Sequence, residues 1–295
     1  MGYVLDSLKR SLSIVKENPP ILAVSFVYAL ISTPIAILPR LFPKMVLSLP
    51  IFLLLAVILF MIFIAPFFTG GLYGMAIEAI ERPINLSTFI KEGKRNYVSL
   101  FIAFFLFFVL IFGLQIGLMM GSFFAAGILK DIIPLSRAVL AFITVLFTIV
   151  ILPILMFFLQ FFDIGIVANH YGAIETFRKS FGFARARLLT VFWYTILRFL
   201  IMIPLIIPNV LVSIYTPRGM QEAGQIGVFG AALPTGLLLL WAVANLVLGA
   251  LIGAIQVVFP SVFYTQSQAQ QIFIEKDKPE TPLHTTALQE RPLPY

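Results

Sequence analysis

The chain has 295 residues, of which 60% are hydrophobic and only 11% are charged. Soluble globular domains usually carry about 25% charged residues, so this composition excludes an ordinary soluble enzyme and a disordered chain. The absence of cysteine excludes a disulfide scaffold, thiolate catalysis and cysteine-ligated metal centres. The net charge of +7 does not indicate a nucleic acid partner, because the basic residues lie beside apolar segments, where they would face lipid phosphates. The composition therefore predicts an integral membrane protein.

Six segments are long and apolar enough to cross a bilayer, which takes about 20 residues. They cover residues 20–38, 46–68, 97–120, 137–162, 188–213 and 234–264. None has an acidic residue in its central part, and turn-forming residues separate them. We expect an all-α fold with six transmembrane helices in a single membrane domain over residues 1–270. A disordered cytoplasmic tail is expected over residues 271–295.

Lysine and arginine are distributed unequally between the two sides of this predicted membrane domain. Fourteen of them lie in the N-terminal segment, in the loops after the second and fourth spans and in the tail, whereas five lie on the other side. Cytoplasmic loops carry an excess of these residues. The distribution predicts a multi-pass protein of the cell membrane with both termini in the cytoplasm.

A short amphipathic segment precedes each odd-numbered span, and the three segments align without gaps over residues 6–18, 84–96 and 175–187. Apolar residues recur in each at i, i+4 and i+7, which places them on one stripe of a helix. The three stripes are Leu8, Leu12 and Val15; Leu86, Ile90 and Gly93; and Phe177, Phe181 and Ala184. The predicted unit is an interfacial helix followed by a two-span hairpin, repeated over residues 5–84, 85–173 and 174–270.

The face opposite each stripe is basic. A helix of this kind lies in the headgroup layer with its basic face toward anionic lipid. Anionic membrane lipids are therefore the expected partners. A second copy of the chain and another membrane protein are the alternative partners. The expected headgroup contacts are Lys9, Arg10, Lys16, Lys91, Lys94, Arg95, Arg178, Lys179, Arg185 and Arg187.

The sections that follow the second and fourth spans have similar sequences. Phe-Phe-Thr-Gly-Gly begins at residue 67, and Phe-Phe-Asp-Ile-Gly-Ile-Val-Ala-Asn begins at residue 161, with Ala-Ile-Glu-Thr-Phe-Arg-Lys-Ser-Phe following over 173–181. This layout resembles the membrane region of the glycerophosphoryl diester phosphodiesterase membrane-domain group and its stand-alone archaeal and bacterial relatives of unknown function. The resemblance implies a six-span membrane protein. Because no phosphodiesterase domain is present, no catalytic residues carry over, and we expect neither enzymatic activity nor a cofactor.

Arg198 is the most informative single residue. It lies eleven residues after Arg187, or about 16 Å along a helix axis, which is near the middle of a hydrocarbon core about 30 Å thick. A charge at that depth is costly and usually marks function. Alternatively, span five begins nearer Tyr194 and Arg198 extends to the cytoplasmic headgroups. The candidate partners of a deeply placed Arg198 are Gln115, Gln160, Asn245, the carbonyl freed by Pro204, and the anionic group of a ligand such as a lipid phosphate.

Small residues recur at four-residue spacing in two spans. The first series is Gly113, Gly117 and Gly121, and the second is Asn245, Gly249 and Gly253. Such spacing lets helix backbones approach closely, so we expect helix packing within the chain at these glycines. Dimerisation and a polar path lined by Gln115, Asn245 and Gln256 are the alternatives.

His170 lies between the fourth and fifth spans, near Asp163 and Glu175 in the sequence. A histidine beside carboxylates can bind a metal or shuttle protons, but the spacing matches no metal motif. We interpret this section as an exposed helix with ordinary charge pairs and expect no metal.

Two functional hypotheses follow. The first is a non-enzymatic membrane protein that binds anionic lipid or scaffolds a membrane partner, based on the basic amphipathic helices. The second is a small-molecule or lipid transporter with a site near Arg198, based on the polar groups and prolines within the spans. A cavity that reaches Arg198 would favour transport or lipid handling, and a solid bundle would favour scaffolding.

Overall fold

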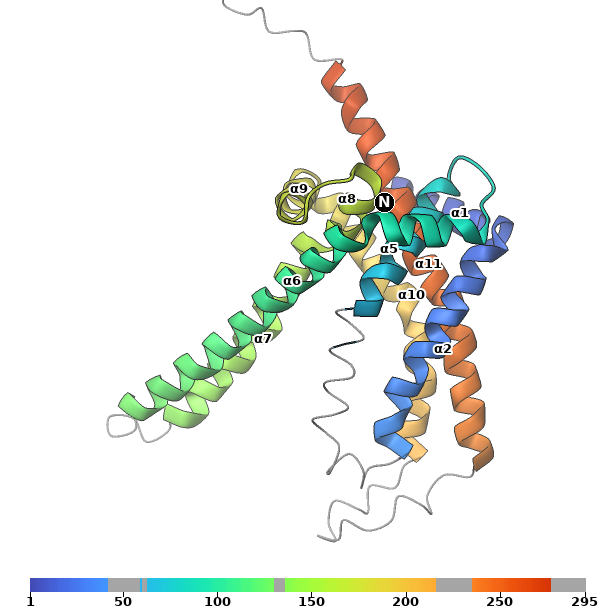
Figure 1. Ribbon diagram of the computed structural model, residues 1–295. Coiled ribbons are helices and arrows are strands. Elements are labelled where there is room, and N and C mark those ends of the chain that lie inside the picture. The colour runs from blue at the N-terminus through green and yellow to red at the C-terminus, as the bar shows by residue number, and fades with distance from the viewer. Residues whose placement is uncertain (42–58, 60–62, 130–135, 216–234, 277–295) are drawn as a thin grey trace, which may run out of the picture.

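A computed structural model describes residues 1–41, 59, 63–129, 136–215 and 235–276 of the chain (Figure 1). Within these ranges the chain is helical and forms no strand, so the all-α prediction is confirmed. The helices are α1 (Gly2–Glu17), α2 (Pro19–Leu41), α5 (Ala65–Glu78), α6 (Leu86–Leu129), α7 (Ser136–Leu159), α8 (Phe162–Asn169), α9 (Ala173–Ala186), α10 (Leu188–Tyr215) and α11 (Thr235–Lys276).

Four helical segments in the described part of the chain are long and apolar enough to cross a membrane. They are Leu86–Leu118, Thr148–Asn169, Leu188–Pro208 and Leu240–Ala269. The pair Gly2–Glu17 and Pro19–Ser32, bent by 89°, makes a fifth if it is taken as one span. Most of the expected span over 46–68, and most of the expected tail, lie outside the described residues. The protein is thus an α-helical membrane protein with several spanning helices.

The long helices form two groups. Helices α6 and α7 run side by side and project away from the others, whereas α2, α10 and α11 lie together (Figure 1). The short helices α1, α5, α8 and α9 gather where the two groups meet (Figure 1). An aromatic cluster fills this junction: Phe161, Tyr194, Phe259 and Phe263 are all at most 1% exposed, and the rings of Tyr194 and Phe263 stack with centroids 4.5 Å apart.

Asn18 and the two prolines after it separate α1 from α2. The side-chain amide of Asn18 donates to the carbonyl of Ile14 at 3.0 Å, and its oxygen accepts from the backbone N–H of Ile84 at 3.3 Å. Pro19 favours an extended conformation at Asn18, which has φ −122° and ψ 75°. Proline is also well suited to the first turn of the next helix. The local sequence therefore ends one helix and starts another.

The expected interfacial helices are separate elements in only two of the three places. Helices α1 and α9 end before α2 and α10 begin, but the segment over 84–96 runs without a break into α6. No proline follows Asn96, and its amide donates to the carbonyl of Glu92 at 3.0 Å within a continuing helix. The expectation of a separate second interfacial helix is wrong, because α6 is continuous from Leu86.

The apolar stripes of the three amphipathic segments are divided between two environments. Leu12, Ile90 and Phe181, which occupy corresponding positions, are 47%, 50% and 46% exposed. The next residues of the stripes, Val15, Gly93 and Ala184, are buried. Each segment therefore packs one edge of its stripe inside the protein and leaves the other edge on the surface.

Candidate functional site

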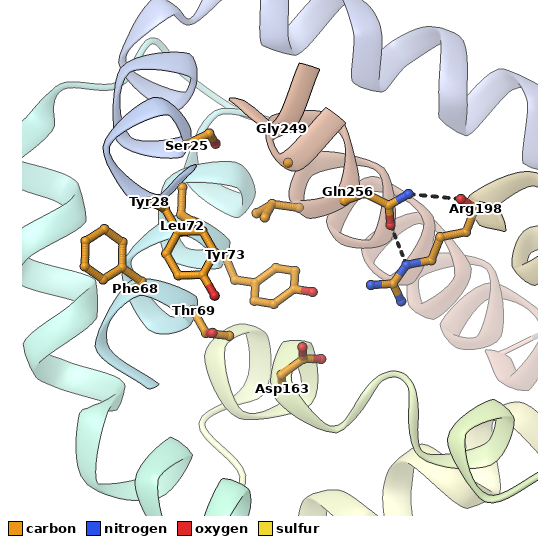
Figure 2. Close-up of a pocket in the computed structure, with 12 residues that line it drawn as sticks. Ser25, Tyr28, Phe68, Thr69, Leu72, Tyr73, Asp163, Arg198, Gly249 and Gln256 are labelled. Atoms are coloured by element: carbon orange, nitrogen blue, oxygen red, sulfur yellow. Dashed lines mark hydrogen bonds between the residues drawn. The ribbon is translucent and has the colours of Figure 1, made fainter. Parts of the chain in front are cut away.

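A cavity of about 230 Å³ lies where α2, α5, α8, α10 and α11 meet (Figure 2). Its lining combines opposite charges, hydroxyl groups, aromatic rings and two glycines. The lining residues are Ser25, Tyr28, Phe68, Thr69, Leu72, Tyr73, Asp163, Arg198, Gly249, Gly253, Gln256 and Val257. Sequence reasoning singled out Arg198 as a ligand-binding candidate, and the structure places it in this cavity.

Arg198 is held inside the helix bundle by Gln256. The Nε of Arg198 donates to Oε1 of Gln256 at 2.7 Å, and Nε2 of Gln256 donates to the backbone carbonyl of Arg198 at 3.0 Å. The two terminal guanidinium nitrogens point to the side on which Tyr73 and Asp163 lie (Figure 2). The side chain therefore faces the cavity (Figure 2).

Asp163, in the first turn of α8, provides the opposite charge in the cavity. Its Oδ1 accepts from the backbone N–H of Ile164 at 2.9 Å. No nitrogen–oxygen pair between Asp163 and Arg198 is within 4 Å, since the ion pairs found in the described residues are Arg82–Glu78 and Arg95–Glu92. The interpretation of this section as an exposed helix was wrong for Asp163, because most of α8 is buried and Asp163 lines the cavity, whereas His170 and Glu175 are exposed.

Ser25 adds a polar group that lacks a partner in the structure. The residue is 3% exposed, and its hydroxyl is buried without a hydrogen bond. Buried hydroxyl groups are usually hydrogen-bonded, so an exception needs an explanation such as a bound group. Because Ser25 lines the same cavity as Arg198 and Asp163, a ligand in the cavity would supply that explanation.

Thr69 and Asp163 come from the two sections of the chain that have similar sequences, and they lie on different helices of the cavity wall. They occupy corresponding positions in the sections that begin with Phe67 and Phe161, and both line the cavity. The glycines two residues later also correspond. A Cβ on Gly71 would lie 2.8 Å from the carbonyl oxygen of Phe89, and one on Gly165 would lie 2.7 Å from Oγ1 of Thr176. Each short helix thus packs closely on the amphipathic segment that follows it in the chain.

The two expected series of packing glycines differ in their surroundings. A Cβ on Gly249 would lie 3.6 Å from Ala29, and one on Gly253 would lie 4.0 Å from Ser25, so this series faces α2 at the cavity wall. The series Gly113, Gly117 and Gly121 is exposed, with no described atom within 4 Å of the Cβ positions. The described part of the chain therefore provides no packing partner for Gly113, Gly117 and Gly121.

The polar residues expected beside Arg198 lie elsewhere. Gln160 donates to the carbonyl of Phe157 and to the hydroxyl of Thr195, both at 3.0 Å. Asn245 donates to the carbonyl of Trp241 at 2.8 Å, and Gln115 is exposed on α6. None of these three residues lines the cavity. Sequence reasoning named Gln256 only as part of a polar path, and missed Ser25, Thr69 and Tyr73.

The basic residues expected to meet headgroups lie outside the cavity, on α1, on the first turns of α6 and on α9. All are exposed except Arg187, which is half-buried. Arg10 donates to the carbonyl of Ile80 at 3.5 Å, and Lys179 lies 5.6 Å from the centre of the Tyr171 ring. His170 is exposed and ends α8 in a left-handed conformation with φ 54°. Within the described ranges, no three metal-ligating side chains form a group.

Comparison with known proteins places the chain in a family. Residues 3–267 match the family described as "Domain of unknown function (DUF7847)". The chain belongs to this family. The match includes every residue that lines the cavity, so the cavity lies within the family domain. No curated protein and no solved structure matches the chain.

Proposed function

We propose that this protein is a multi-pass, non-enzymatic protein of the cell membrane that binds the phosphate group of a membrane lipid at Arg198. The observation that carries the proposal is the guanidinium of Arg198, which faces a cavity and has no carboxylate within 4 Å among the described residues. A partly buried arginine without a carboxylate in direct contact is costly in a low-dielectric environment. An anionic ligand that enters the cavity would reduce that cost.

The chemistry of arginine supports a phosphate in particular. The planar guanidinium presents paired N–H donors that match phosphate oxygens in a bidentate arrangement. Gln256 accepts from Nε and fixes the side chain, and the two terminal nitrogens point toward the side on which Tyr73 and Asp163 lie (Figure 2). A guanidinium that is already positioned loses less conformational entropy on binding.

The proposed topology has six spans in three hairpins with both termini in the cytoplasm. Three features support it: the excess of Lys and Arg on one side, the corresponding positions of Thr69 and Asp163, and the similar packing of Gly71 and Gly165. In this topology the basic residues of α1, α6 and α9 lie at the cytoplasmic headgroup layer. They would concentrate anionic lipid near the protein, with about 1 kcal/mol contributed by each residue close to the surface.

Lipid or small-molecule transport is the second candidate function. The observation that favours it is the position of the cavity between helices that contain prolines, Pro204 and Pro208 in α10 and Pro260 in α11. Interrupted helices with buried polar groups occur at transport sites. A fluorescent-lipid scrambling assay in proteoliposomes tests it, because binding alone moves no lipid between leaflets.

Native mass spectrometry of the gently solubilised protein tests the proposed binding. The wild type should retain a phospholipid adduct that Arg198→Leu loses, whereas Arg82→Leu, an exposed change between α5 and α6, should retain it. Arg198→Lys keeps a positive charge but not the planar fork, so its adduct should be weakened. Equal adducts on the wild type and on correctly folded Arg198→Leu would contradict the proposal and favour a scaffolding role.

A further inference from the structure

The cavity has a cationic pole and an anionic pole on different helices, Arg198 on α10 and Asp163 on α8. We infer that its ligand is a zwitterion of the phosphoethanolamine type, with the phosphate at Arg198 and the ammonium at Asp163. This inference rests on the proposed function, which concerns the phosphate alone. It adds the class of headgroup and gives Asp163 a role.

The separation of the two charges is the first argument. Opposite charges attract strongly where water is scarce, yet these two do not approach within 4 Å in a shared cavity. Each is held by its own neighbours: Arg198 by Gln256, and Asp163 by the backbone N–H of Ile164. The remaining polar atoms of both side chains point toward the space between them, as does the hydroxyl of Tyr73 (Figure 2). A group with two opposite charges would satisfy both residues at once.

The remaining lining of the cavity also suits an ammonium-bearing headgroup. The rings of Tyr28 and Phe68 line the cavity and lie with centroids 5.3 Å apart. Aromatic faces attract organic cations, and ligand ammonium groups are often bound by aromatic rings together with a carboxylate. The unpartnered hydroxyl of Ser25 provides a further donor or acceptor for the phosphate or the ammonium.

The size of the cavity limits the ligand to a small headgroup. An apolar cavity of about 150 Å³ holds benzene, and pockets for drug-sized ligands begin at about 300 Å³. A volume of about 230 Å³ therefore fits a group somewhat larger than benzene. A phosphoethanolamine group meets this limit, whether it is part of a lipid or free.

A competition experiment by native mass spectrometry tests the inference. The full-length protein is mixed with equal amounts of phosphatidylethanolamine, phosphatidylglycerol and N-acetylated phosphatidylethanolamine, which keeps the phosphate but lacks the ammonium. The wild type should prefer phosphatidylethanolamine by roughly tenfold or more, as expected for a charged hydrogen bond. Asp163→Asn should lose this preference and still retain phosphatidylglycerol. Glu175→Gln, the same kind of change at an exposed position of α9, should behave as the wild type.

The outcomes separate this inference from the proposal on which it rests. Loss of every lipid adduct in Arg198→Leu, together with equal binding of the three lipids by the wild type, would support the phosphate site and overturn the zwitterion. The comparison of the three lipids on the wild type needs no variant. It therefore tests the zwitterion inference even if Asp163→Asn does not fold. Soluble phosphoethanolamine distinguishes the two sources of the group: displacement of the lipid by it assigns the site to the free compound, and persistence of the lipid assigns it to the membrane.

Discussion

Gln256 contacts Arg198 through both atoms of its side-chain amide, accepting from Nε at 2.7 Å and donating to the backbone carbonyl at 3.0 Å. This pair links α10 to α11 inside the bundle and determines which part of the guanidinium reaches the cavity. The arrangement makes Gln256 a positioning residue for the anion site. Its removal should affect both the stability of the protein and the retention of the ligand.

Gln256→Leu should leave Nε of Arg198 without its acceptor at a partly buried position. Loss of one partner of a hydrogen bond to a charged group costs about 1.5–3 kcal/mol, so the Tm in detergent should fall and the lipid adduct should weaken. Gln256→Glu keeps an acceptor beside Nε and should lower the Tm less. A Tm of Gln256→Leu equal to that of the wild type would show that the pair does not hold Arg198 in place.

Gly71→Ala and Gly165→Ala should both destabilise the protein. Each new methyl group would lie within 3 Å of an oxygen of the neighbouring amphipathic segment, and overpacking typically costs about 1–3 kcal/mol. Thermal unfolding followed by tryptophan fluorescence measures the effect. Gly182→Ala on α9 is the matched control: no described atom lies within 4 Å of its Cβ position, so it should be neutral or stabilise by up to about 1 kcal/mol. Equal changes in Tm for all three variants would argue against the close packing of α5 and α8 on the amphipathic segments that follow them.

Ser180 on α9 stabilises the break between α7 and α8. Its hydroxyl donates to the carbonyl of Phe158 at 2.9 Å and accepts from the backbone N–H of Phe161 at 3.3 Å. Both backbone groups lie at helix ends, where they lack intrahelical partners. Ser180→Ala should therefore lower stability by about 1–3 kcal/mol, measured as a fall in Tm. Ser13→Ala, at an exposed position on α1, should change it by less than about 0.5 kcal/mol.

The sequence predicted the helical class because that class depends on local features, whereas the depth of Arg198 in the membrane stays a prediction. Hydropathy marks helices that can span a membrane, and the rise per residue converts the distance from Arg187 into depth. The break after α1 also follows from local chemistry, since Pro19 and Pro20 follow Asn18. The unbroken start of α6 does not follow from the absence of a proline after Asn96, because no proline follows Arg187 either and α9 and α10 are separate there.

The composition of the site depended on contacts that the sequence does not determine. Gln256 follows Arg198 by 58 residues, and only the relative rotation of α10 and α11 brings the two together. Asp163 was assigned to an exposed helix because it follows the predicted fourth span. Its correspondence to Thr69 was visible in the sequence, but the packing of α5 and α8 around one cavity was not.

The proposed topology predicts the side of the membrane for each exposed segment, and the absence of cysteine makes the chain suitable for single-cysteine labelling. Ser13→Cys and Ser87→Cys should react with a membrane-impermeant maleimide only after permeabilisation, whereas Lys130→Cys, between the third and fourth predicted spans, should react in intact cells. The unmodified chain, which lacks cysteine, should not react under either condition. Comparing the labelling of residues 13 and 87 tests whether the expected span over 46–68 crosses the membrane. Two spans between them return the chain to the same side, so labelling on opposite sides would overturn the six-span topology.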